Sequence, residues 1–165
     1  MPVEWPCYSA IAQAIQVVSA EGLRESVITA SLIQPMTLSM RDQEILSVNQ
    51  AMLESVVSGD WAAYAKHCSD DVSCFEAETN GHLVEGLPFH QYYFELPAGD
   101  APSSPVTVTM ARPHLRWLCD DAVVISYTRL TQRLSGGEPI TASCCETRIW
   151  HRRNDTWQQV HVHRS

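Results

Sequence analysis

The residues in this sequence that are best suited to chemistry are arginines near its carboxyl end. Residues 129–165 carry 6 basic and 3 acidic side chains, whereas residues 1–128 carry 5 basic and 16 acidic ones. An arginine stays charged in a protein, and its planar guanidinium holds a carboxylate through paired hydrogen bonds. The whole chain has a formal net charge of −8, and such a field repels nucleic acid. We therefore expect a small anion or an acidic surface as the local partner, and no nucleic acid.

Strand alternation predicts the direction in which two of these arginines point. Successive side chains of a strand lie on opposite faces. In one expected strand, Arg129 shares its face with Tyr127. In the expected last strand, Arg164 shares its face with Val160 and Val162. Each arginine therefore ends an apolar face that the fold must bury.

The turns between the strands predict which positions are neighbours. Antiparallel pairing across the glycine turn places Arg129 opposite about residue 144, and the following turn brings that row beside residue 164 or 165. Arg129 and Arg164 should then be close. Arg148 lies about four residues along the middle strand, roughly 13 Å at about 3.3 Å per residue. Only a strongly curled sheet would bring Arg148 into the same cavity.

Two interpretations of these inward arginines remain open. One is a set of internal ion pairs, for which Glu76, Glu85 and Glu146 are the candidate partners. The other is a pocket that awaits a small carboxylate. Removing one partner of a buried ion pair costs about 3–5 kcal/mol. Either interpretation therefore predicts that the arginine positions tolerate substitution poorly.

The histidines offer a metal site as a rival chemistry. His161 and His163 share a strand face, and with His151 or His114 they could bind zinc. Alternating histidines are common on surface strands, however, and the six cysteines include no CxxC pair. We expect reduced thiols, no metal and no cofactor.

Proton-transfer catalysis is the second rival. Tyr127, His90 and either Glu76 or Glu78 could form an acid–base site. No activated nucleophile accompanies them, and guanidinium groups favour binding an existing anion over abstracting a proton. We expect no catalytic residue.

The elements that must position these residues can be placed by periodicity and turn signals. Helices are expected at residues 41–58, ended by Gly59, at 61–68, capped by Asp60, and at 88–95. Strands are expected at 72–77, 82–86, 106–118 with a bend near Pro113, 121–134, 139–152 and 156–164, with a loop at 96–105. A long antiparallel meander with few helices indicates an α+β domain whose sheet curls around the first helix.

Three stretches then carry a resemblance to a known family. Residues 84–95 (VEGLPFHQYYFE), 125–132 (ISYTRLTQ) and 146–165 (ETRIWHRRNDTWQQVHVHRS) resemble the association (hub) domain of calcium/calmodulin-dependent protein kinase II. The likeness covers residues 41–165. It implies a cone-shaped, nuclear-transport-factor-2-like (NTF2-like) α+β fold, with a long N-terminal helix wrapped by a curved antiparallel sheet. Residues 1–40 have no recognised counterpart in the family, and we expect an N-terminal extension, partly helical or disordered.

The resemblance also implies a role. In the kinase, this domain holds many subunits together in stacked rings, so we expect a ring-shaped homo-oligomer, with kinase hub domains as candidate partners. Arg129, Arg148 and Arg164 match arginines that line the family's pocket, and His90 matches a histidine near its mouth. With the inward Tyr127, these residues form the expected binding set for a small carboxylate.

The chain itself lacks kinase motifs. It has no glycine-rich phosphate loop and no DFG, and His151-Arg152-Arg153 is not an HRD catalytic loop. We expect a stand-alone hub that is not an enzyme. The alternative is an isomerase- or cyclase-type enzyme that uses the same cone pocket.

Two further features bear on location. No apolar run approaches 18 residues, and the first residues, MPVEWPCYSAIAQ, include no basic region of a secretory signal. We expect a cytoplasmic chain with no membrane partner.

Overall fold

The computed structural model describes residues 38–96 and 105–165. Almost all of the expected N-terminal extension, and most of the expected loop at 96–105, lie outside these described residues. The elements, in chain order, are α1 (Met40–Ser58), α2 (Trp61–His67), β1 (Cys68–Phe75), the 3-10 helix η1 (Ala77–Thr79), β2 (Val84–Glu85), α3 (Leu87–Phe94), β3 (Thr107–Cys119), β4 (Ala122–Ser135), β5 (Glu138–Arg153) and β6 (Thr156–Arg164). Among the helices of the described residues, none has the length and apolar character needed to cross a membrane.

Helix α1 begins at a capping box, one residue before its expected start at residue 41, and ends at Gly59 as expected. The Ser39 side chain accepts a hydrogen bond from the Asp42 backbone N–H at 3.2 Å, and the Asp42 side chain accepts one from the Ser39 N–H at 3.0 Å. This reciprocal capping box satisfies the first turn of the helix. Gly59 ends the helix in a left-handed conformation with φ of 70°. Asp60 then caps α2 by accepting from the Ala63 N–H at 2.9 Å.

One face of α1 forms the centre of the core. Ile45, Asn49, Met52 and Leu53 are all fully buried, and their spacing is that of a single helix face. Asn49 is the one polar residue among them, and its side-chain oxygen accepts a hydrogen bond from the Trp150 indole N–H at 3.0 Å. This bond ties the middle of the helix to β5.

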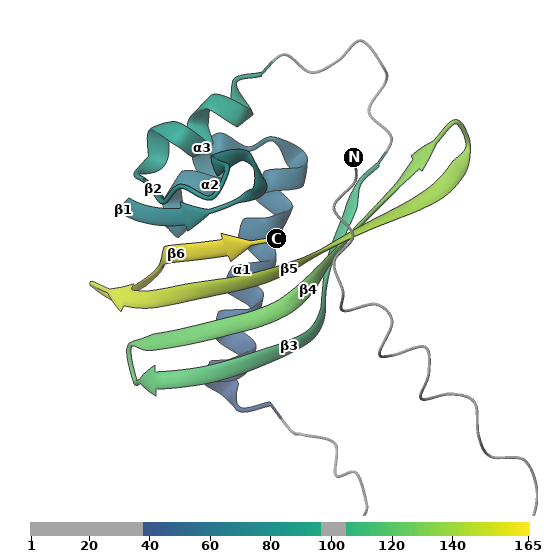
Figure 1. Ribbon diagram of the computed structural model, residues 1–165. Coiled ribbons are helices and arrows are strands. Elements are labelled where there is room, and N and C mark those ends of the chain that lie inside the picture. Colours follow the sequence, from purple (N-terminus) through teal and green to yellow (C-terminus); the bar gives the residue numbers. More distant parts are fainter. Residues whose placement is uncertain (1–37, 97–104) are drawn as a thin grey trace, which may run out of the picture. The chain divides into compact units, whose positions relative to one another are not determined.

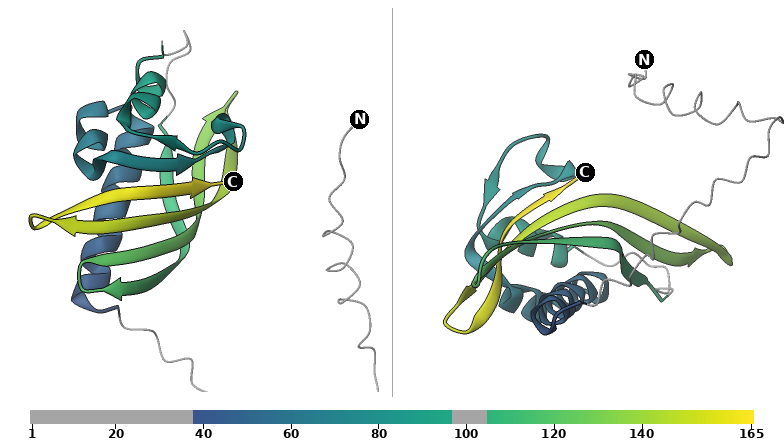
Figure 2. Two further views of the ribbon diagram at one scale, coloured as in Figure 1. Left: turned by 60° about the vertical axis from the view of Figure 1, so that its left-hand side comes forward. Right: turned by 90° about the horizontal axis from the view of Figure 1, so that it is seen from below.

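A six-stranded sheet in the order β2-β1-β6-β5-β4-β3 curves around α1 (Figure 1). Viewed from below, the long strands bend over the helix instead of lying flat (Figure 2). Neighbouring strands are antiparallel except β1 and β6, which run parallel. The expected curved antiparallel sheet is present, and the β1–β6 contact adds a parallel pair that joins the short strands to the meander.

The pairing expected for the arginines is confirmed. Arg129 lies opposite Cys144 in the β4–β5 ladder. Arg164 lies opposite Glu146 in the β5–β6 ladder. The row that contains Arg129 is therefore adjacent to the end of β6, where Ser165 exchanges two backbone hydrogen bonds with Cys145.

The face alternation expected for β6 is wrong at one residue. The ladder pairs Trp150 with Gln159 and then Ile149 with His161, so Val160 is an extra residue in a β-bulge. The bulge reverses the alternation within the strand. Gln159 is fully buried on the core side together with Val162, whereas Val160 is only partly buried.

A second irregularity lies where Pro113 predicts it. The β3–β4 register shifts between Ala111 and His114, and Arg112 has a left-handed φ of 52°. Pro113 has no N–H to donate to a ladder, so the strand bends at this point. The helix expected at residues 88–95 is α3, which carries its proline in the first turn. The short strand expected at 72–77 begins earlier, at Cys68, directly after α2.

The core analysis generates a stability prediction. Leu53→Ala should lower the free energy of unfolding by about 2–5 kcal/mol, because it removes a fully buried side chain and leaves a cavity. Leu118→Ala is the matched control, since Leu118 is 61% exposed, and it should change stability by less than about 0.5 kcal/mol. Urea denaturation measures both, and equal losses for the two variants would contradict the placement of α1 in the core.

Candidate functional site

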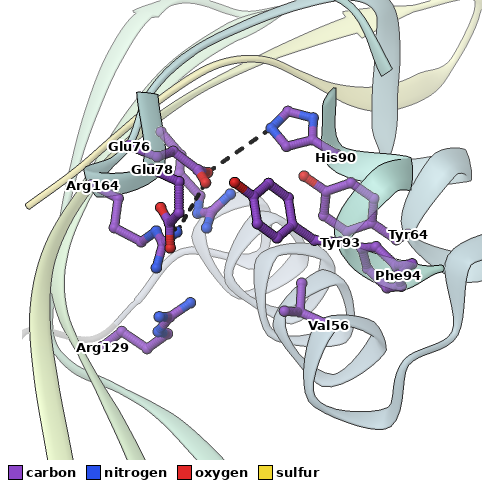
Figure 3. Close-up of a pocket in the computed structure, with 10 residues that line it drawn as sticks. Val56, Tyr64, Glu76, Glu78, His90, Tyr93, Phe94, Arg129 and Arg164 are labelled. Carbon is purple, nitrogen blue, oxygen red and sulfur yellow. Dashed lines mark hydrogen bonds and ion pairs between the residues drawn. The ribbon is translucent and has the colours of Figure 1, made fainter. Parts of the chain in front are cut away.

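A pocket of about 210 Å³ lies between the helices and the inner face of the sheet. The residues that line it are Val56, Tyr64, Glu76, Glu78, His90, Tyr93, Phe94, Arg129, Arg148 and Arg164. We call it the arginine pocket. Figure 3 shows Arg129 and Arg164 on one side of it, facing the rings of Tyr64, Tyr93 and Phe94 on the other. The pocket therefore has an ionic wall and an aromatic wall.

Arg148 forms the buried end of the ionic wall. Its Nη2 donates to Oε2 of Glu146 at 2.8 Å, and its Nε donates to the Tyr127 hydroxyl at 2.8 Å. Its Nη1 donates to the side-chain oxygen of Gln159. Burial alone would lower the pKa of Arg148, but Tyr127 and Glu146 raise it above its ordinary value. The guanidinium therefore stays charged although it is only 4% exposed.

Glu146 is the anion that makes this burial possible. Besides Arg148, its Oε2 accepts from the Tyr127 hydroxyl at 2.6 Å, and its Oε1 lies 3.1 Å from Nη1 of Arg129. Burial would raise the pKa of Glu146, but Arg148 and Arg129 outweigh burial and hold that pKa below its ordinary value. Glu146 thus bridges two guanidinium groups as a carboxylate.

Arg164 belongs to a second ion cluster at the outer end of the pocket. Its Nη2 donates to Glu76 at 2.9 Å and to Glu78 at 2.7 Å. Burial would lower the pKa of Arg164, but the two carboxylates raise it. The carboxylates are held by η1, a short turn of helix that begins directly after Glu76. Three guanidinium groups thus face three carboxylates, so the pocket is electrically balanced.

The structure decides which internal ion pairs form. Glu146 and Glu76, two of the three candidate partners, pair with the arginines as expected. Glu85 is exposed on β2 and makes no ion pair with any described residue. Glu78, which was not a candidate, forms an ion pair with Arg164.

Some polar atoms of the pocket have no hydrogen-bond partner within the described residues. They are Nε of Arg129 and both ring nitrogens of His90. His90 lies on α3, is 6% exposed, and has its ring at an edge-on angle to Tyr64. Burial lowers its pKa, and Arg148 and Arg164 lower it further against the opposite effect of Glu76. The ring is therefore neutral at pH 7 and offers a free nitrogen lone pair.

Four of the five expected site residues meet in this pocket. Arg129, Arg148, Arg164 and His90 all line it, and the curl of the sheet brings Arg148 in despite its distance along β5. Tyr127 does not line the pocket. Its hydroxyl lies behind the ionic wall, bonded to Glu146 and Arg148.

Sequence reasoning missed several residues of this region. Gln159 was hidden by the bulge in β6, because strict alternation places it on the wrong face. Tyr64 and Phe94 form the aromatic wall from two helices that do not adjoin in sequence, with ring centroids 5.0 Å apart. The sequence does show that α2 and α3 are rich in aromatic residues. It does not show that the two helices turn these residues toward the same cavity.

The histidines considered for zinc do not assemble. His161 and His163 both pack against Phe75, and Nδ1 of His161 lies 2.8 Å from the Ser73 hydroxyl. They lie on the face of β6 opposite Val162, away from the core. His114 and His151 lie on other strands and join no metal-type cluster within the described residues.

The chain has the fold of the NTF2-like proteins. One of these, a protein of unknown function from Shewanella oneidensis, is 17% identical and aligns over 76% of this chain and 99% of its own length with a TM-score of 0.57. A likeness at that level shows the fold alone. The expected α+β, NTF2-like class is confirmed.

Closer matches show the family. The family model of the calcium/calmodulin dependent protein kinase II association domain matches residues 41–165. The hub homology domain of Chlamydamonas reinhardtii CamKII is 44% identical and covers 76% of this chain and 97% of its own, with a TM-score of 0.72. The type II delta subunit of calcium/calmodulin-dependent protein kinase from Oryctolagus cuniculus is 40% identical over 147 residues, which make up 88% of this chain. The chain belongs to the calcium/calmodulin-dependent protein kinase II association domain family, as its sequence indicated.

The chain matches only part of the rabbit kinase. The aligned residues are 27% of that protein's length. Family membership therefore concerns the association domain, and the activity and partners of the whole kinase are not carried over with it.

The buried ion pair generates a second prediction. Glu146→Gln should lower the free energy of unfolding at pH 7 by about 3–5 kcal/mol, because Arg148 then stays buried beside a neutral group. Glu138→Gln, at the exposed start of the same strand, is the control and should match wild type within about 0.5 kcal/mol.

The same variants carry a pH test. The folded-state pKa of Glu146 lies below its ordinary value of 4.5. Its contribution is complete above that value and is lost as pH falls through the folded-state pKa. The stability gap between wild type and Glu146→Gln, measured by denaturation at several pH values, should shrink in acid. A gap that widens in acid would contradict the ionised state assigned to Glu146.

Proposed function

We propose that this chain is an association (hub) module that assembles into a ring-shaped homo-oligomer and binds a small carboxylate in the arginine pocket. The observation that carries the binding part is the gathering of Arg129, Arg148, Arg164 and His90 around one cavity. The assembly part rests on family membership, since the matching domains are association and hub domains.

The described surface supports self-association. The hairpin formed by the distal ends of β4 and β5 projects beyond the body of the sheet (Figure 1). Leu134 is 51% exposed and Ile140 is 41% exposed on this hairpin. Leu134 pairs with Pro139 and Ile140 with Arg133 in the β4–β5 ladder, so the two side chains lie on opposite faces of the hairpin. Each face thus offers a partner one exposed apolar side chain. Hub domains of kinases from the same family are the other candidate partners.

The pocket supports a small anionic ligand. Nε of Arg129 is buried and has no acceptor within the described residues, so it can donate to an incoming carboxylate. Glu78 pairs with Arg164 but its side chain is 37% exposed, so it can turn outward and give its place on Arg164 to the ligand while Glu76 keeps its own ion pair with that arginine. A volume of about 210 Å³ suits a molecule of a few heavy atoms. The aromatic wall would cover the apolar part of such an acid.

We propose no catalytic role for these residues. The Tyr127 hydroxyl both donates to Glu146 and accepts from Arg148, and burial raises its pKa to about 12. A hydroxyl held in this way is poorly placed to give or take a proton at neutral pH. No specific observation favours the isomerase- or cyclase-type alternative.

Oligomeric mass tests the assembly. Native mass spectrometry of the purified chain at micromolar concentration should show a single multimeric species. Leu134→Asp places a charge on the projecting hairpin and should shift that species to smaller assemblies. Leu83→Asp, at another exposed leucine, should leave the mass unchanged. A monomeric wild type would remove the assembly proposal.

A thermal-shift series tests the carboxylate pocket. A ligand at about 100 times its dissociation constant stabilises the folded state by about 2.7 kcal/mol. At least one small mono- or dicarboxylate should raise the melting temperature of wild type and of Arg133→Gln, which changes an exposed arginine on the same strand as Arg129. Arg129→Gln should abolish that shift while Arg148 still holds Glu146. An equal rise in melting temperature in Arg129→Gln and Arg133→Gln, or no rise in wild type, would count against carboxylate binding in the pocket.

A further inference from the structure

A second group of ligand-type atoms lies beside the arginine pocket. The Cys74 thiol sulfur, a carboxylate oxygen of Glu76 and a ring nitrogen of His90 all lie within 4.8 Å of one another. Cys74 and Glu76 are two residues apart at the end of β1, so their side chains share a face. His90 comes from α3, which packs against β1. Two elements therefore converge on three donor atoms.

The state of His90 shows that this convergence is not a hydrogen-bonded cluster. Neither ring nitrogen of His90 has a hydrogen-bond partner within the described residues, although the side chain is 6% exposed. Its Nε2 points toward Oε1 of Glu76 at 3.9 Å (Figure 3), which is too long for a hydrogen bond. Buried polar groups without partners are rare and call for a specific explanation. A cation between the two atoms supplies one.

We propose that Cys74, Glu76 and His90 form a binding site for a divalent transition-metal ion of the zinc type. Sulfur, imidazole nitrogen and carboxylate oxygen are the ligands that zinc uses, and three protein ligands leave one position open. Nitrogen and oxygen ligands of a tetrahedral zinc are about 3.4 Å apart for bonds of about 2.1 Å. The observed 3.9 Å between His90 and Glu76 needs only a small closure. Glu76 and His90 also line the arginine pocket, so the ion would lie at the edge of that pocket. The site needs no bound carboxylate.

The charges around the site are compatible with a cation. Arg164 holds Glu76 through Oε2, and this leaves Oε1 free toward His90. An arginine that grips the outer oxygen of a ligating carboxylate orients it, in the way outer-shell partners do at metal sites. Arg164 also keeps Glu78 as a second carboxylate, and Arg148 is neutralised by Glu146. Because the three carboxylates already balance the three guanidinium groups, the Cys74 thiolate offsets one of the two charges of the ion. An anion in the open coordination position would offset the other.

Binding requires one proton to leave. The Cys74 thiol is buried, and a metal ligand must be the thiolate. The thiol proton passes to solvent as the sulfur–metal bond forms, and neutral His90 binds without losing a proton. The sequence did not indicate this site, because Cys74 and Glu76 match no zinc-binding motif and His90 is distant from them in the chain.

Metal titration tests the proposal with the whole chain. Metal-free protein, with no carboxylate present, should take up one Zn²⁺ per chain in competition with a chromophoric chelator. Cys74→Ser and His90→Gln should each weaken binding at least tenfold. Cys145→Ser and His163→Gln change an exposed cysteine and an exposed histidine and should bind like wild type. Circular dichroism confirms that each variant is folded.

Cobalt gives a readout that needs no variant. Co²⁺ bound through Cys74 should produce a thiolate-to-cobalt charge-transfer absorption in wild type and in Cys145→Ser. Wild type without stoichiometric Zn²⁺ uptake, or with Co²⁺ bound but no thiolate band, would overturn the proposal. Equal weakening of zinc binding in Cys145→Ser and His163→Gln would also overturn the proposal, because it would show that the ion binds at exposed residues. None of these results depends on whether a carboxylate binds.

Discussion

The interaction on which this structure depends is the ion pair of Glu146 and Arg148 inside the curl of the sheet. Burying two charges costs several kcal/mol per ion unless every remaining donor and acceptor is satisfied. Tyr127 on β4 and Gln159 on β6, the strands on either side of β5, accept the remaining hydrogen bonds of Arg148. The pair therefore fixes three adjacent strands against one another at the floor of the pocket. Arg129 and Arg164 are less deeply buried than Arg148, and they pair with Glu146 and with Glu76 and Glu78 respectively.

Helix α1 explains why the sheet can present these charges inward. The bond from Trp150 to Asn49 holds the helix against the middle of β5, and apolar side chains on either side of Asn49 fill the concave face. The sheet bends around this filling, and the bend carries Arg148 toward Arg129 and Arg164. A flat sheet would keep them apart along their strands. Packing of the core thus sets the geometry of the site, although no core side chain of α1 carries a charge there.

Much of the fold follows from local signals in the sequence. Gly59 and Asp60 mark the end of α1 and the start of α2, and the glycine turn between β4 and β5 sets the strand register. The arginine positions of the site follow from that register. The rest could not be predicted, because it depends on features without a local signature. The bulge at Val160 reverses one face and hides Gln159, and the approach of α3 to β1 depends on packing between distant segments.

The place of β6 in the sheet has a consequence for how the chain folds during synthesis. β6 is the last of the described strands, yet it lies between β1 and β5. Strand β1, translated much earlier, gains its long-range neighbour only after residues 156–164 have left the ribosome, and pairings across such separations form slowly. Until then both edges that will flank β6 stay open. Nascent chains that stall before this strand therefore expose two unpaired edges, which makes them substrates for chaperones and prone to aggregation.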